Sequence, residues 1–347
     1  MKKIFFSLLA VAAMAACAKT EVAYDAANEI GFAPAVKTLT KAAMSGTLPT
    51  TQDLGIWAYW NGVNGTVESN GATYAIYTDA FLANALFGNK NGNNWGGKNE
   101  AYPWPTNGAL VFAGYTVPSQ NGFAAAYDLE DNKMTFTGYT QSTDIANTFD
   151  LCWFGRTANS YNNRATGAAV DVTLSHALTW ITIQIKGDTN TAGSKPWRVT
   201  KATLLAANTV GTTGTCVYGN DGKAKATWTS NTPANVVIKA AAQDLNQSAA
   251  DYESTAKGVV VIPQTPVKLE VEYEYPVGNE YKPGKSTIDL TLTNHKDENG
   301  QTIATSINEW ASGVHYTYTL VFKANEILVA PTYGEWANGG NQTVVVE

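Results

Sequence analysis

Few residues in this 347-residue chain are of the types that carry nucleophilic or metal chemistry. The cysteines and histidines are Cys17, Cys152, Cys216, His176, His295 and His315. None of them lies in a CxxC or HExxH pattern, and no GxSxG elbow is present, so the usual spacings of zinc ligands or of a nucleophile are missing. We therefore predict that the protein is not an enzyme and that it has no catalytic residue, metal site or cofactor.

Cys17 is the exception, because its surroundings suggest a modification. It follows "MKKIFFSLLAVAAMAA", in which Lys2 and Lys3 precede an apolar run too short to span a bilayer as a helix. This leader predicts export, and the alanines before Cys17 resemble a bacterial lipobox, in which the cysteine is acylated, for example with palmitate. Acyl chains contribute roughly 0.8 kcal/mol per buried CH₂ and would hold the precursor at a membrane. We expect residues 1–16 to be the signal peptide, with an incidental cysteine as the alternative.

The other two cysteines lie in apolar, strand-like surroundings. Cys152 is in "DLCWFG" and Cys216 in "GTCVYG". Buried free cysteine packs as a small hydrophobic residue, so we expect two separate thiols rather than a disulfide. The acidic residues Asp128, Glu130 and Asp131 lack the glycine and the final glutamate of a calcium loop and predict a hairpin turn instead.

The composition is that of a folded chain with no nucleic-acid partner. Only 15% of residues are charged, whereas 44% are hydrophobic and 11% aromatic, and the formal net charge is −6. A chain this apolar can bury a core, and it carries no basic patch of the size that a nucleic acid requires.

From Ile56 onward, apolar and polar residues alternate in short runs, which is the pattern of half-buried strands. In "KLEVEYEY" (268–275), Leu269 and Val271 alternate with glutamates, and "WITIQIKG" (180–187) and "HYTYTLVF" (315–322) repeat the pattern. About a dozen such runs, separated by turn signals such as "GNDGK" (219–223), predict an all-β fold of β-sandwiches.

Two stretches carry helical signals. Ser306 and Glu309 have the spacing of a capping box before Trp310 and predict one short helix. The stretch 78–88, "TDAFLANALFG", is compatible with a helix, but its glycine-rich continuation leaves the assignment open. That continuation, 88–99, lacks a phosphate-loop signature and predicts an exposed polar loop.

A polar stretch at 156–167, "RTANSYNNRATG", separates two strand-dense halves. We expect one β-sandwich at 42–165 and a second at 166–325. The sequence "NQTVVVE" (341–347) then predicts a further strand, which needs a partner for its backbone groups.

The chain resembles the fimbrillin-like lipoproteins of type V bacterial pili over nearly its whole length. The resemblance rests on the order of the lipobox, "NEIGFAP", "DLGIWAYW", "YPWPTNGALVFAGYTVP", "LSHALTWITIQIKG", "GVVVIPQ", "INEWASGVHYTYTLVF" and "NEILVAPTYGEW". It implies an all-β fold of two tandem transthyretin-like β-sandwich domains with a C-terminal donor-strand segment at 326–347.

The resemblance also implies processing and assembly. A trypsin-like protease would remove an N-terminal strand, here within residues 17–41 and containing Ile30 and Phe32, and another subunit's C-terminal segment would fill the groove. Cleavage would follow Lys37 or Lys41, since no arginine precedes Arg156. The candidate donor residues form two runs, and which of them makes the main contact stays open: Ile327, Leu328, Val329, Val344, Val345 and Val346.

The implied function is that of a structural subunit of a cell-surface fimbrium in cell adhesion, in the stalk because a donor segment follows the last sandwich strand. The expected partners are copies of the chain, related pilus subunits, the processing protease, the outer membrane through the precursor's lipid and a host or bacterial surface ligand. The expected locations are the cell outer membrane and the extracellular fimbrium. The alternatives are an anchor or accessory subunit and a surface-anchored glycan-binding lipoprotein.

Overall fold

The computed structural model describes residues 24–36, 46–60, 66–69, 72–75, 79–106, 108–144, 148–156, 168–218, 223–252, 259–292, 306–324, 326–335 and 344–345. All regular elements among these residues are strands. The all-β prediction is therefore confirmed. Within the same ranges, no helix is long and apolar enough to cross a membrane.

The first sheet has eight strands and closes on itself. Its order is β14-β13-β10-β4-β7-β8-β2-β3, and β2 also pairs with β14. The strands are β2 (Gly31–Val36), β3 (Gly46–Thr47), β4 (Leu54–Trp60), β7 (Asp79–Asn91), β8 (Asn94–Gly97), β10 (Leu110–Thr116), β13 (Cys152–Phe154) and β14 (Val170–His176). The sheet surrounds an apolar core that includes Phe32, Phe87, Trp95 and Phe112.

Two small pairs of strands flank this sheet. β1 (Tyr24–Glu29) pairs with β9 (Pro103–Pro105), and β5 (Thr66–Ser69) forms a hairpin with β6 (Ala72–Ala75).

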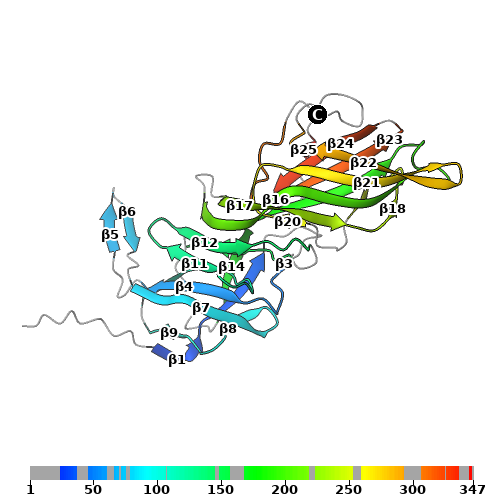
Figure 1. Ribbon diagram of the computed structural model, residues 1–347. Coiled ribbons are helices and arrows are strands. Elements are labelled where there is room, and N and C mark those ends of the chain that lie inside the picture. The colour runs from blue at the N-terminus through cyan, green and yellow to red at the C-terminus, as the bar shows by residue number, and fades with distance from the viewer. Residues whose placement is uncertain are drawn as a thin grey trace, which may run out of the picture.

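The C-terminal half supplies most of a sandwich of a seven-stranded and a six-stranded sheet. The first of these sheets contains β11 (Ala124–Asp128), β12 (Lys133–Thr140), β16 (Arg198–Tyr218), β17 (Ala224–Lys239), β18 (Gln243–Asp244), β21 (Lys268–Val277) and β22 (Glu280–Asp289). The second contains β15 (Thr179–Gly187), β19 (Ala250–Asp251), β20 (Val259–Val261), β23 (Val314–Lys323), β24 (Glu326–Glu335) and β25 (Val344–Val345). In Figure 1 most of these strands form a lobe of their own, whereas β11 and β12 lie next to the eight-stranded sheet. Ile181, Ile183 and Ile185 point into the core between the sheets, as the alternation of "WITIQIKG" predicts.

A third apolar core joins the two halves. It combines Trp57, Phe136 and Trp153 from strands before residue 165 with Trp180 and Cys216 from strands after it. Strands also cross the predicted boundary at 165, because β12 pairs with β16 while β14 pairs with β13 and β2. The transthyretin-like arrangement and the exact domain limits stay predictions.

The approach of β16 to this third core depends on glycine. The Trp228 ring stacks on Phe136 with centroids 6.3 Å apart. A Cβ atom at Gly214 would lie 2.7 Å from the Trp228 ring, closer than real Cβ atoms come to their neighbours. Gly214 therefore lets Trp228 cover the strand directly.

The described part of the stretch 78–88, residues 79–88, is not a helix but part of β7. Residue Asn84 has a positive φ of 54°, and the register with β4 shifts nearby. This bulge shifts the alternation of inward and outward side chains by one residue. Both Leu82 and Phe87 therefore reach the core, although they are an odd number of residues apart.

The predicted polar loop at 88–99 is also wrong, because β7 and β8 form a hairpin there. Its Trp95 is fully buried and donates its indole N–H to the Gln52 carbonyl at 2.8 Å. Burial of this one aromatic side chain turns a polar stretch into a paired strand.

The short helix predicted at Ser306 to Gly313 is absent from the described residues 306–313. The backbone N–H of Ile307 bonds to Thr291 O, and that of Trp310 bonds to Gln264 O. The Trp310 indole donates to the Tyr318 hydroxyl at 2.8 Å. These tertiary bonds satisfy the donors that a helix would otherwise have used.

Two predicted hairpins are confirmed. Asp128 closes the β11–β12 turn, because its carboxylate accepts the backbone N–H groups of Glu130 and Asp131 at 3.0 and 3.1 Å. The β16–β17 pairing runs up to Tyr218 and Ala224, on either side of "GNDGK".

The third core predicts coupled unfolding of the two halves. We expect Phe136→Ala to lower the free energy of unfolding by about 3–5 kcal/mol, because it leaves a cavity between aromatic rings. We also expect it to split one thermal transition into two in differential scanning calorimetry. Val277→Ala, at a position 51% exposed, should change stability by less than about 0.5 kcal/mol. Two transitions already in the unsubstituted protein would contradict the coupling.

Candidate functional site

The predicted removable strand occupies one place in the fold, between β8 and β14. Phe32 of β2 is the register partner of Trp95 in β8 in an antiparallel pair. On the other side, residues 32–36 pair in parallel with 170–174 of β14. β2 is therefore the strand that closes the first sheet.

The side chains of this strand alternate between core and surface. Ile30, Phe32 and Val36 are 1%, 0% and 2% exposed, whereas Ala35 faces solvent. The Phe32 ring makes edge-to-face contacts with Phe87 and Phe112, with centroids 5.1 and 5.0 Å apart. The structure thus brings both predicted residues, Ile30 and Phe32, into the same core.

Removal of β2 would open a groove that exposes apolar core surface and leaves backbone groups without hydrogen-bond partners. Burial of Ile30, Phe32 and Val36 stabilises the fold by about 1.5–3 kcal/mol for each side chain. Both β8 and β14 would also present unpaired backbone N–H and C=O groups. A groove of this kind favours the addition of another strand with an apolar row.

The two predicted donor runs are held very differently. Leu328 and Val329 are 4% and 0% exposed, and their strand β24 pairs with β23 along its whole length. Ile327 packs against the same core from a partly buried position. By contrast, β25 is held by two register pairs, Thr332 with Val345 and Tyr333 with Val344. Of the two runs, the second can leave with less loss of native structure.

Several predicted site residues lie outside the described residues. These are the lipidation candidate Cys17, the cleavage candidates Lys37 and Lys41, and Val346. Their predicted roles stay predictions.

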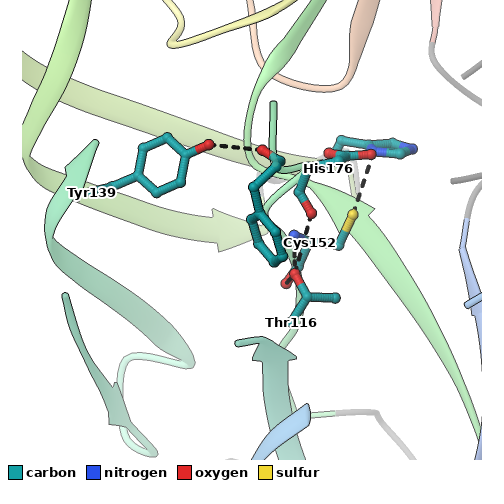
Figure 2. A network of polar contacts seen from close by, with 6 residues as sticks. Thr116, Tyr139, Cys152 and His176 are labelled. Atoms are coloured by element: carbon teal, nitrogen blue, oxygen red, sulfur yellow. Dashed lines mark hydrogen bonds and ion pairs between the residues drawn. The ribbon is translucent and has the colours of Figure 1, made fainter. Parts of the chain in front are cut away.

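The structure reveals one cluster that sequence spacing does not show. Cys152 and His176 are register partners on β13 and β14, and Asp150 lies two residues before Cys152. The His176 Nδ1 atom lies 2.8 Å from Asp150 Oδ2 and 3.4 Å from Cys152 Sγ, and Figure 2 shows the sulfur directed at the histidine. The strand pairing that unites these residues could be found only by aligning "LCW" against "LSH" as neighbouring strands.

This cluster lacks the properties of a catalytic thiolate. Burial raises the pKa of the Cys152 thiol well above its ordinary value, and the Asp150 carboxylate adds to the increase. A nucleophilic cysteine needs the opposite shift and access to a substrate, whereas Cys152 is 0% exposed. Cys152 and Cys216 are both free and buried, which confirms the prediction of two separate thiols.

The aromatic side chains mostly fill cores rather than form a surface for sugars. Of the ten tryptophans, seven are buried in the described residues and Trp197 and Trp228 are partly buried. Trp180, for example, is 3% exposed and stacks on His315. This arrangement favours core packing over the glycan-binding alternative.

The burial of Phe32 predicts a strong and local effect of truncation. We expect Phe32→Ala to lower the free energy of unfolding by about 3–5 kcal/mol. Hydrogen exchange should then accelerate in β2, β8 and β14 more than in β23. The matched control is Ala35→Ser, which changes an exposed position of the same strand. Equal effects of the two substitutions would show that β2 does not seal this core.

The chain was compared with family models, with curated protein sequences and with solved structures. A sequence model described as fimbrillin-like matches residues 40–336, a span that excludes both β2 and β25. A search of curated protein sequences gives no match.

Among solved structures, the chain is similar to a fimbrial protein from Bacteroides vulgatus, with 18% identity, a TM-score of 0.51, and coverage of 88% of this chain and 99% of the other. It is also similar to a putative cell adhesion protein from Bacteroides uniformis, with 16% identity, a TM-score of 0.49, and coverage of 89% and 99%. A third is a C-terminally truncated tip fimbrial protein, Mfa3, from Porphyromonas gingivalis, with 8% identity, a TM-score of 0.42, and coverage of 89% and 100%. The similarity to the Bacteroides vulgatus protein supports the fold of this chain and not a role.

The family assignment rests on the sequence model, because it spans most of the chain. This chain belongs to the fimbrillin-like family.

Proposed function

We propose that this chain is a stalk subunit of a cell-surface fimbrium and that it polymerises by strand exchange after loss of β2. The observation that carries the proposal is the position of β2, which closes a sheet and seals a core through a single short strand. The fimbrillin-like family assignment supports a pilus-related subunit.

Covalent continuity explains why exchange would wait for cleavage. While β2 is part of the chain, its effective concentration at the groove is far above that of any other molecule. Cleavage after Lys37 or Lys41 would convert β2 into a separate peptide that can dissociate and be lost by dilution. The groove would then be open to a strand from another copy.

The weakly held C-terminal segment is the better donor. Withdrawal of Ile327, Leu328 and Val329 would open the core of the C-terminal sandwich at a cost of about 1.5–3 kcal/mol for each side chain. Release of β25 breaks the two register pairs that join it to β24. We therefore assign the donor role to Val344, Val345 and Val346, with β24 staying in place.

A donor at one end and a groove at the other give head-to-tail contacts. Such contacts do not close on themselves unless a rotation happens to close a ring, so they propagate into a fibre. Copies of the same chain and related pilus subunits are the proposed partners, and the exposed fimbrium is the proposed location. Cys17 acylation would hold the precursor at the outer membrane before this step.

A reversible tether on β2 tests the exchange. Ala35 and Thr47 are register partners in the antiparallel β2–β3 pair, whose Cα spacing of about 4.5–5.5 Å suits a disulfide. The chain to test carries Cys17→Ser, Ala35→Cys and Thr47→Cys, with a specific protease site replacing residues 38–43. After cleavage, we expect no detergent-resistant ladder while the disulfide keeps β2 in place, and a ladder after reduction, as seen on denaturing gels.

Two controls accompany this experiment. The same cleavable chain without the Ala35→Cys and Thr47→Cys pair should form ladders under both redox conditions. The tethered chain truncated before residue 337 should form none after reduction, because it lacks the donor. Ladders of equal length with the disulfide intact would contradict exchange at the β2 groove.

Lipid attachment gives a separate prediction. We expect Cys17→Ala to move the exported precursor from the membrane fraction to the soluble fraction and to abolish labelling by a palmitate analogue, because the acyl chains are lost. Cys216→Ala is the matched control and should leave both readouts unchanged. Unchanged membrane partitioning of Cys17→Ala would rule out acylation at this residue.

A further inference from the structure

The Asp150, Cys152 and His176 cluster lies where the two halves of the molecule meet. His176 ends β14, and after two intervening residues β15, a strand of the six-stranded sheet, begins. Cys152 belongs to the core of the first sheet, whereas its neighbours Leu151 and Trp153 belong to the third core. The cluster therefore lies between two apolar cores.

The backbone around the cluster is held firmly. The Thr116 hydroxyl accepts the Cys152 N–H at 2.8 Å and faces the carbonyls of Asp150 and Cys152 at 3.3 and 3.4 Å (Figure 2). The Ala177 N–H bonds to the Leu151 carbonyl at 2.8 Å. These bonds fix both strands on either side of the three side chains.

The three side chains offer converging ligand atoms of three different kinds. One imidazole nitrogen, one sulfur and one carboxylate oxygen lie within 4.8 Å of one another. The side chains of His176 and Asp150 are 1% and 0% exposed, and Cys152 is 0% exposed. Water therefore contributes little to solvating these groups.

One oxygen atom of the cluster lacks a hydrogen-bond partner. Asp150 Oδ1 is buried and has no hydrogen-bond partner, although a buried carboxylate oxygen normally accepts at least one bond. The Nδ1 atom of His176, in turn, faces both Oδ2 and Sγ, although it can carry only one proton. A cation among these atoms would satisfy all of them at once.

We propose that Asp150, Cys152 and His176 form a structural zinc site that binds one Zn²⁺ at the junction of β13 and β14. A tetrahedral Zn²⁺ with Zn–N of about 2.0 Å and Zn–S of about 2.3 Å separates the two ligand atoms by about 3.5 Å. The observed separation of Nδ1 and Sγ is 3.4 Å. His176 Nδ1 and Asp150 Oδ2, which are 2.8 Å apart as a hydrogen-bonded pair, would separate to about 3.3 Å on metal binding. The unpartnered Oδ1 would take the fourth position of a distorted tetrahedron, so the site needs no fourth side chain.

Charge and donor type both select zinc. Zn²⁺ with one thiolate, one carboxylate and one neutral imidazole has no net charge, which suits a site excluded from water. The thiolate argues against Mg²⁺ and Ca²⁺, and the carboxylate argues against Cu(I). Binding releases the thiol proton to solvent, and no redox step is involved.

A cleft lies close in the chain to the cluster. It has a volume of about 510 Å³ and includes Gln52, Gln120, Thr140 and Phe149 in its lining. Phe149 directly precedes Asp150 in the chain.

Zinc would strengthen the connection between β13 and β14, which few backbone pairs hold together. β13 and β14 share only two register pairs, Cys152 with His176 and Trp153 with Ser175. β14 is also a partner of β2, so it becomes a wall of the open groove if β2 leaves. This consequence rests on the proposed function, whereas the zinc site itself does not.

The test uses the full chain carrying Cys17→Ser in detergent, so that Cys152 and Cys216 are its only thiols. After chelation and dialysis against Zn²⁺, elemental analysis should find about one Zn²⁺ per chain, and Co²⁺ in its place should give a thiolate charge-transfer band. Cys152→Ser should lose the band and bind zinc at least tenfold more weakly. Cys216→Ser is the matched control, another buried thiol without histidine or aspartate, and should behave like the parent chain.

A second measurement does not depend on the folding of a variant. In mild denaturant, Zn²⁺ should slow alkylation of Cys152 at least tenfold in the parent chain while Cys216 serves as the internal reference. If Zn²⁺ leaves the ratio of the alkylation rates of Cys152 and Cys216 unchanged, the proposal is overturned. Absence of bound zinc, or loss of zinc from Cys216→Ser as large as from Cys152→Ser, would do the same.

Discussion

The closure of the first sheet by β2 is the constraint on which the rest of the molecule depends. One strand supplies the backbone partners of β8 and β14 and places Phe32 between Phe87 and Phe112. Without it, the sheet has two open edges and a core with a missing row of side chains. A fold that depends on one short strand near an end of the described chain can be kept closed or opened by a single peptide-bond cleavage, and this is the physical basis of the proposed polymerisation.

The junction between the two halves determines what opening the groove leaves behind. The third core ties strands of the first sheet to the C-terminal sandwich through aromatic side chains, among them Trp57, Phe136 and Trp180. These contacts do not involve β2, so its loss leaves them in place. The polar cluster at the end of β14 lies at this same junction. The groove can therefore be emptied while its supporting strands stay attached to the other half.

The sequence predicts the strands where the local residue pattern agrees with the tertiary pairing, and it fails where distant contacts override the local pattern. "WITIQIKG" alternates clearly and lies in β15, and the continuous apolar run "LGIWAYW" forms β4. The stretch 78–88 and the capping-box segment at Ser306 have local helical signals, but the partners that override them, β4 and Gln264, are far away in the sequence. Ile30 and Phe32 were found through the family resemblance, and the structure supplies the reason for their importance. The cluster around His176 could not be predicted, because its residues come together only through the register of β13 and β14.

In the proposed assembly, the groove between β8 and β14 holds β2 in the precursor and the C-terminal segment of a neighbouring copy in the fibre. Cryo-electron microscopy of fibres isolated from the cell surface tests this claim most directly, at a resolution that distinguishes side chains. We expect the first residue of each copy to be Thr38 or Ala42, and the strand beside Trp95 to carry the sequence around Val344 to Val346 from the next copy. Density for Phe32 still seated between Phe87 and Phe112 in assembled fibres would contradict this assembly.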